Sequence, residues 1–200
     1  SGAHRRIALY MVRAFGGTSS RRLVFGFMCA SAFLSMWISN TSTTLMLLPV
    51  ALAALEKSDD PRLASPLLLG IAYAASIGGI GTPIGTPPNM VFMGVYSEVT
   101  GGAISFGQWM LWAIPVVLIM LPIAGLWITR GVSKSGGVAL PASEAWSTAE
   151  RRVLIVFSIT AVLWMTRKGP WGGWSEWLAL PYANDAMVAF IAVIALFVIP

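Results

Sequence analysis

The sequence predicts an all-α integral membrane protein that contains a re-entrant helical hairpin and a discontinuous transmembrane helix. Three observations lead to this prediction. Of the 200 residues, 56% are hydrophobic and only 10% are charged, a composition outside the range of soluble domains. Two uncharged runs, Leu23–Leu55 and Leu63–Ser97, are each longer than the roughly 20 residues that one crossing needs. Each run also has a centre that interrupts a continuous apolar helix.

The N-terminal residues predict a helix that lies on the membrane surface. His4–Val12 combines basic and apolar side chains, as interfacial amphipathic helices do. The small residues of Gly16–Ser20 would end that helix. We therefore expect residues 1–22 to form an interfacial amphipathic helix that leads into the first apolar run.

A polar tripeptide, Ser39-Asn40-Thr41, divides the first apolar run. Each flank holds roughly 15 residues, or about 23 Å of helix, which is too short for two full crossings. We expect residues 23–55 to form a re-entrant hairpin, with half-helices over Leu23–Ile38 and from the tripeptide at the tip to Leu55. Irregular backbone at membrane depth needs cover from protein or a water-filled cavity, so the tip is buried or lines a binding site. The alternative is two helices that pack through small polar residues.

The second apolar run is interrupted at Ser76–Asn89, which is too rich in glycine and proline for a continuous helix. Thr86 suits the N-cap of a helix, and Pro87 suits the first helical position, where its missing N–H is not needed. A helix broken at mid-membrane therefore restarts near Thr86 and continues through Val95. The alternative is a flexible hinge that binds nothing.

The remaining apolar segments predict three further helices. Gln108–Thr129 is an ordinary spanning helix. Ser147 and Glu150 have the spacing of a capping box, which predicts a helix over Thr148–Thr166, and Ala186–Pro200 is a last apolar span. The tryptophans near these helix ends are typical of an aromatic belt: Trp109, Trp112, Trp127, Trp171, Trp174 and Trp177.

The basic residues predict the orientation of the chain. A hairpin returns to the side it entered, which places eleven basic residues on one face and only Arg167 and Lys168 on the other. The positive-inside rule then makes the hairpin mouth cytoplasmic. The net charge of +5 does not indicate nucleic acid, because the basic residues are dispersed at helix ends.

Two interrupted helices in one membrane chain indicate a transporter's midplane site. Carbonyl groups that end the first half-helices near Ile38 and Gly85 can bind a cation, and N–H groups that open the second halves at Thr41 and Thr86 can face an anion. No carboxylate, lysine or histidine lies inside the long apolar runs, so we expect neither a proton relay nor an enzyme. Neutral oxygens suit Na⁺, and the polar cavity suits a small anionic substrate.

These motifs resemble the divalent anion/sodium symporter (DASS) family of dicarboxylate, citrate and sulfate carriers. The resemblance rests on FLSMWISNTSTT and, about 45 residues after the tripeptide, on YAASIGGIGTPIGTPPN, and it covers essentially the whole chain. It implies one half of an inverted-repeat transporter in the inner or plasma membrane, which works as a homodimer by an elevator motion. Residues 63–129 would join the hairpin in the transport domain, and residues 148–200 would be scaffold-type helices.

The resemblance also implies which residues bind the ligands. The sodium site would comprise Ser35, Ser39, Asn40 and Gly85. The substrate would meet Ser39, Asn40 and Thr41, and we expect Thr86 and Pro87 at the second break to complete that site.

The sequence departs from the family pattern because it contains no second Ser-Asn-Thr hairpin and no second broken helix. We therefore expect either a partial sequence or a subunit whose other half comes from another chain. The expected function is sodium-coupled transport of a divalent anion of the C4-dicarboxylate, citrate or sulfate class. The alternative is a pore-forming subunit, since channels also use re-entrant half-helices.

Overall fold

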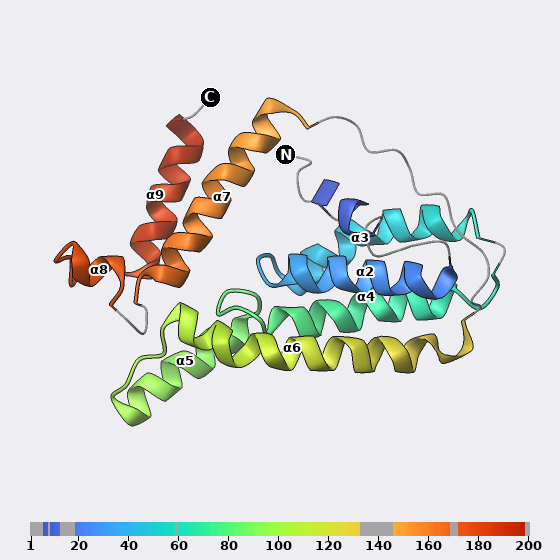
Figure 1. Ribbon diagram of the computed structural model, residues 1–200, viewed down its shortest axis with the longest axis horizontal. Helices are drawn as coiled ribbons and strands as arrows, with labels where there is room; N and C mark the ends of the chain where they lie inside the picture. The colour runs from blue at the N-terminus through green and yellow to red at the C-terminus, as the bar shows by residue number, and fades with distance from the viewer. Residues whose placement is uncertain are drawn as a thin grey trace.

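The computed structural model describes residues 6, 7, 9–12, 19–58, 60–132, 146–168 and 172–198. Every regular element in this part of the chain is helical, which confirms the predicted all-α class. Figure 1 shows α2, α4 and α6 side by side in one layer, with α7 and α9 as a second pair at an angle to it. The elements are α2 (Ser20–Ser35), α3 (Asn40–Leu55), α4 (Ala64–Gly79), α5 (Pro87–Thr100), α6 (Phe106–Ile128), the 3₁₀ turn η1 (Thr129–Gly131), α7 (Thr148–Thr166), α8 (Trp174–Trp177) and α9 (Asp185–Val198).

Helices α2 and α3 form an antiparallel helical hairpin (Figure 1). Local capping sets its boundaries, because the hydroxyls of Ser19 and Ser39 each accept a hydrogen bond from a backbone N–H in the first turn of the helix that follows. The boundaries therefore differ from the prediction. Helix α2 begins at Ser20 and ends at Ser35, and the turn occupies residues 36–39. Asn40 and Thr41, which were expected at the tip, are already the first residues of α3.

The predicted break in the second run lies between α4 and α5. Helix α4 packs closely on α2, and glycine makes this contact possible. A Cβ on Gly78 would overlap the backbone of Ala32. A Cβ on Gly70 would instead lie 3.1 Å from its nearest atom, which belongs to the flexible side chain of Met28. The hairpin, α4 and the N-terminal segment share one buried apolar cluster, whose fully buried members include Phe27, Met28, Leu47, Leu63 and Leu67.

Among the described residues, one helical segment, Phe106–Gly131, is long and apolar enough to cross a membrane by its length and composition. Three apolar helices are shorter: Asn40–Leu55, Ala64–Gly79 and Asp185–Val198. Helices α5 and α9 expose most of their apolar side chains, and each buries a single residue, Asn89 and Val188 respectively.

The predicted capping box at the start of α7 is confirmed, with reciprocal hydrogen bonds between Ser147 and Glu150. Glu150 also pairs with Arg6, whose Nε lies 2.7 Å from its Oε1. Residues 6, 7 and 9–12 are helical, and Leu9 and Val12 are buried in the apolar cluster. The predicted interfacial helix over residues 1–22 stays a prediction. Several of its residues lie outside the described part, as do Lys134, Trp171 and Pro200.

Candidate functional site

The turn of the α2–α3 hairpin lies against the break between α4 and α5. The Thr82 hydroxyl donates a hydrogen bond to the carbonyl oxygen of Met36. A Cβ on Gly81 would lie 2.7 Å from the Met36 Cε atom, and one on Gly85 would lie 2.9 Å from the carbonyl oxygen of Ser35. The two interruptions that the sequence predicts separately therefore form one polar junction.

Neutral oxygen atoms gather at this junction. The buried Ser35 hydroxyl donates to Asn40 Oδ1 over 2.6 Å. The same Oδ1 lies 2.5 Å from the position that a Cβ on Gly79 would occupy. The Asn40 amide therefore packs against the backbone of Gly79, which has no side chain. Three predicted sodium-site residues, Ser35, Asn40 and Gly85, are thus brought together. Unwound backbone carbonyls coordinate Na⁺ in broken-helix transporters, and the hydroxyl and amide oxygens here are neutral oxygens of the same kind.

Asn89 joins the two ends of the break. Its Nδ2 donates to the carbonyl oxygens of Gly79 and Thr82, each over 2.8 Å, and its side chain is buried. Carbonyl groups at a helix C-terminus have no partner within the helix, and the Asn89 amide supplies one. The resemblance to the divalent anion/sodium symporters also implies that Asn89 supports this loop, and these two hydrogen bonds show how it does so.

The Ser39 side chain takes no part in the Ser35–Asn40 hydrogen bond. Its hydroxyl caps α3, accepting from Ser42 N and donating to Ser42 Oγ over 2.9 Å. Ser39 and Thr41 are exposed. Because Ser42 and Thr43 already donate their N–H groups to Ser39, the N–H groups of Asn40 and Thr41 are the ones that point out of the helix end.

Thr86 is the N-cap of α5, as predicted, but its hydroxyl makes no capping hydrogen bond. Pro87 and Pro88 occupy the first two helical positions and have no N–H to donate. The Asn89 N–H donates to Thr86 O over 3.1 Å. Helix α5 is therefore poor in backbone donors at its start, so α3 is the better N-terminus for an anion.

Two buried polar atoms near the junction have no hydrogen-bond partner among the described residues. They are Nε1 of Trp37 and Oγ1 of Thr43, and Thr43 is fully buried. Trp37 lies in the turn, and Thr43 lies near the start of α3. Buried polar groups almost always have partners, so each of these two atoms is available to a further hydrogen-bond partner.

Known transporters resemble this chain over nearly its whole length. A family model described as a citrate transporter (CitMHS) matches residues 1–199. The sodium-dependent dicarboxylate transporter SdcS of Staphylococcus saprophyticus is 32% identical, over 98% of this chain and 41% of the relative. SdcS of Staphylococcus aureus strain bovine RF122 / ET3-1 has the same identity and shares. The chain thus spans about two fifths of the length of these curated relatives, which are named as transporters, not as enzymes.

Proposed function

The chain belongs to the citrate transporter (CitMHS) family, and we propose that it carries the first half of the binding site of a sodium-coupled carrier of divalent anions. The substrate class is a C4-dicarboxylate, citrate or sulfate. The names of the relatives, sodium-dependent dicarboxylate transporters, support both the ion and the substrate class. Such a carrier is a multi-pass protein of the plasma membrane.

One observation carries this proposal: the hydroxyl of Ser35 and the amide oxygen of Asn40 lie 2.6 Å apart, against the bare backbone of the α4–α5 break. No charged residue occurs in either apolar run that forms this junction. A neutral oxygen cluster suits a monovalent cation, because a carboxylate there would carry a high cost of burial without its ion. Na⁺ would bind at Ser35, Asn40 and the backbone of Gly85, with Ser39 contributing from the turn.

The anion would bind on the outer side of the same turn. The N–H groups of Asn40 and Thr41 open α3 with the positive end of its dipole, and the exposed Ser39 hydroxyl is adjacent. Thr86 and Pro87 would form the facing wall, Thr86 through its unused hydroxyl. A cation on one side of Asn40 would then favour an anion on the other, which couples the two ligands.

The dimensions of the helices support a re-entrant hairpin and a broken helix. Helices α3 and α4 each have 16 residues, or about 24 Å at the helical rise, which is less than the roughly 30 Å of a bilayer core. In this proposal residues 23–55 and 63–129 form the transport domain, and residues 148–200 form the scaffold. The transport domain moves as an elevator in a homodimer, with the hairpin mouth in the cytoplasm and a second inverted repeat outside this sequence.

The test uses the full-length protein in proteoliposomes. An inward Na⁺ gradient should drive accumulation of radiolabelled succinate, citrate or sulfate, whereas an equal K⁺ gradient should not. Asn40→Ala should abolish the Na⁺-driven component. The alternative, a pore-forming subunit, predicts equilibration without accumulation whichever cation forms the gradient, and that result would overturn the proposal.

A further inference from the structure

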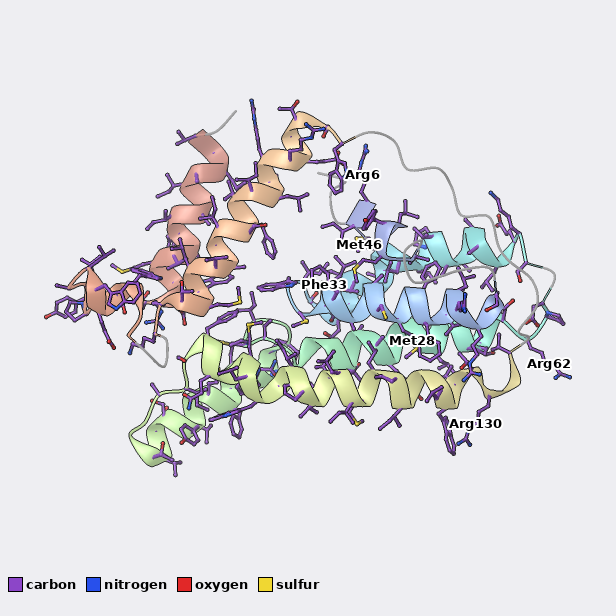
Figure 2. The ribbon with its side chains drawn as sticks, viewed as in Figure 1. Arg6, Met28, Phe33, Met46, Arg62 and Arg130 are labelled. Carbon is purple, nitrogen blue, oxygen red and sulfur yellow. The ribbon has the colours of Figure 1, made fainter. Side chains whose placement is uncertain are left out.

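An open cavity of about 390 Å³ lies at the mouth of the hairpin, far from the α2–α3 turn. It is lined by Asp60, Pro61, Arg62, Arg130, Gly131 and Val132. The first three residues belong to the loop between α3 and α4, and the last three follow α6. Figure 2 shows Arg62 and Arg130 at the same end of the helical layer. Two arginines from distant parts of the chain therefore line one cavity.

The position of Arg130 indicates the depth of this cavity in a membrane. It follows directly on α6, within the one described segment that is long and apolar enough to cross. The Arg130 Cζ atom lies 3.8 Å above the ring of Trp127, and this tryptophan is 66% exposed. Exposed tryptophans at the end of a spanning helix mark the level of the lipid headgroups. Stacking on the ring also fixes the direction of the guanidinium fork.

An apolar stripe leads from this level into the membrane. Ile119, Ile123 and Trp127 recur at four-residue spacing along α6, so they share one face of the helix. All three are more than half exposed. The stripe ends beneath Arg130. A cationic group therefore lies above an apolar surface that acyl chains can cover.

Hydrogen bonds from neighbouring residues hold the walls of the cavity. Arg21 Nε donates to Thr129 Oγ1 over 3.1 Å, and Thr129 in turn donates to the carbonyl oxygen of Gly125 over 2.6 Å. The carboxylate of Asp60 accepts the backbone N–H of Arg62 over 3.0 Å, so it shapes the loop. The side chains of Arg62 and Arg130 are exposed, so both can reach an anion at the membrane surface.

We propose that this cavity binds the phosphate of an anionic phospholipid from the leaflet at the hairpin mouth. Arg62 and Arg130 hold the phosphate oxygens from two sides, because a guanidinium fork matches phosphate geometry. The acyl chains lie along the stripe of α6. Basic pockets beside spanning helices are known to take anionic headgroups. The stripe favours a lipid over a free anion, since a soluble phosphate has no apolar part that would contact the stripe.

The experiment titrates the purified full-length protein in detergent with phosphatidylglycerol or phosphatidylcholine and counts bound lipids by native mass spectrometry. Each arginine near an anionic surface contributes roughly a fivefold factor in affinity. The double variant Arg62→Gln/Arg130→Gln should therefore bind phosphatidylglycerol about 25-fold more weakly, with phosphatidylcholine binding unchanged. Glutamine keeps much of the side-chain volume, and circular dichroism of each variant verifies its helicity.

The matched control is Arg22→Gln/Lys57→Gln, which removes two exposed basic residues that also lie at the mouth of the hairpin but do not line the cavity. This control should bind phosphatidylglycerol nearly as the unchanged protein does. An equal loss in both double variants would mean a diffuse surface charge and would overturn the proposal, as would no loss in either. Displacement of the lipid by millimolar inorganic phosphate would assign the cavity to a free anion instead. This test does not depend on sodium or on transport.

Discussion

The side-chain amide of Asn89 donates a 2.8 Å hydrogen bond to the carbonyl oxygen of Gly79, across the break between α4 and α5. A second hydrogen bond from the same nitrogen reaches Thr82 O, also over 2.8 Å. The glycine- and proline-rich segment is thus a turn held by buried polar contacts rather than a loose hinge. Because Gly79 also lies against the Asn40 amide, Asn89 indirectly supports the wall of the proposed sodium site.

Replacing Asn89 by aspartate should destabilise the protein. The substitution keeps the shape but removes both donors, and it places a carboxylate against two carbonyl oxygens. A buried polar group without a partner costs about 1–3 kcal/mol, and more for a charged one, so the unfolding temperature should fall by several degrees. Intrinsic tryptophan fluorescence during heating measures the unfolding temperature. Asn184→Asp is the control, because Asn184 accepts from Met187 N at an exposed helix start, where aspartate caps equally well. An equal fall in unfolding temperature for both variants would contradict a stabilising role of the two Asn89 hydrogen bonds.

Alanine at Gly78 should separate α2 from α4. The added Cβ would overlap the backbone of Ala32, and backbone cannot move aside as a side chain does, so overpacking should cost about 1–3 kcal/mol or more. Gly94→Ala is the opposite case, since a Cβ there meets nothing within 4 Å, and in a helix alanine is favoured by roughly 0.5–1 kcal/mol. Thermal unfolding of both variants compares them. A Gly78→Ala protein as stable as the Gly94→Ala protein would show that the helices do not touch here.

Removing the Asn40 amide should weaken sodium and substrate together. Its Oδ1 belongs to the oxygen cluster, and its side-chain N–H groups can donate to the anion on the proposed substrate side. Loss of a hydrogen bond to a charged group costs about 1.5–3 kcal/mol, or roughly ten- to a hundred-fold in affinity. Isothermal titration of each ligand to Asn40→Ala should show both losses. Loss of only one would contradict a shared role.

Ser35 and Thr41 should separate the two ligands. Ser35→Ala removes a hydroxyl from the sodium side, and Thr41→Ala removes one from the exposed side. Bound sodium raises the affinity for the anion, and the bound anion raises the affinity for sodium. Substrate affinity must therefore be measured at saturating sodium. There Ser35→Ala should recover nearly normal affinity, whereas Thr41→Ala should stay roughly tenfold weaker or more. The same response of both variants to sodium would contradict a cation side and an anion side of α3.

Cysteine labelling should test the hairpin in the membrane. With Cys29 replaced by alanine, Arg21→Cys and Glu56→Cys should react with an impermeant maleimide from the same side, because they flank the two open ends of the hairpin. Lys168→Cys, after α7, should react from the opposite side. Labelling of Arg21→Cys and Glu56→Cys from different sides would show that each helix crosses the membrane.

Local chemistry made most of the helical pattern predictable. The α4–α5 break was visible because several glycines and prolines close together disfavour a continuous helix. The capping box of Ser147 and Glu150 and the start of α5 after Thr86 likewise depend on neighbours in sequence. The start of α2 was missed because Ser19 was counted among the residues that end the preceding helix, although its hydroxyl caps the helix that follows.

The sequence by itself determined where the apolar helices are interrupted and which polar groups each interruption holds. Only the tertiary structure decided which of these groups meet. Asn40 rests on Gly79 because α2 and α4 pack closely enough to bring the two interruptions together. Ser39, by contrast, turns to Ser42 although it precedes Asn40 directly. Capping depends on residues a few positions apart, whereas the junction depends on the packing of helices that are distant in sequence, and no local pattern encodes that packing.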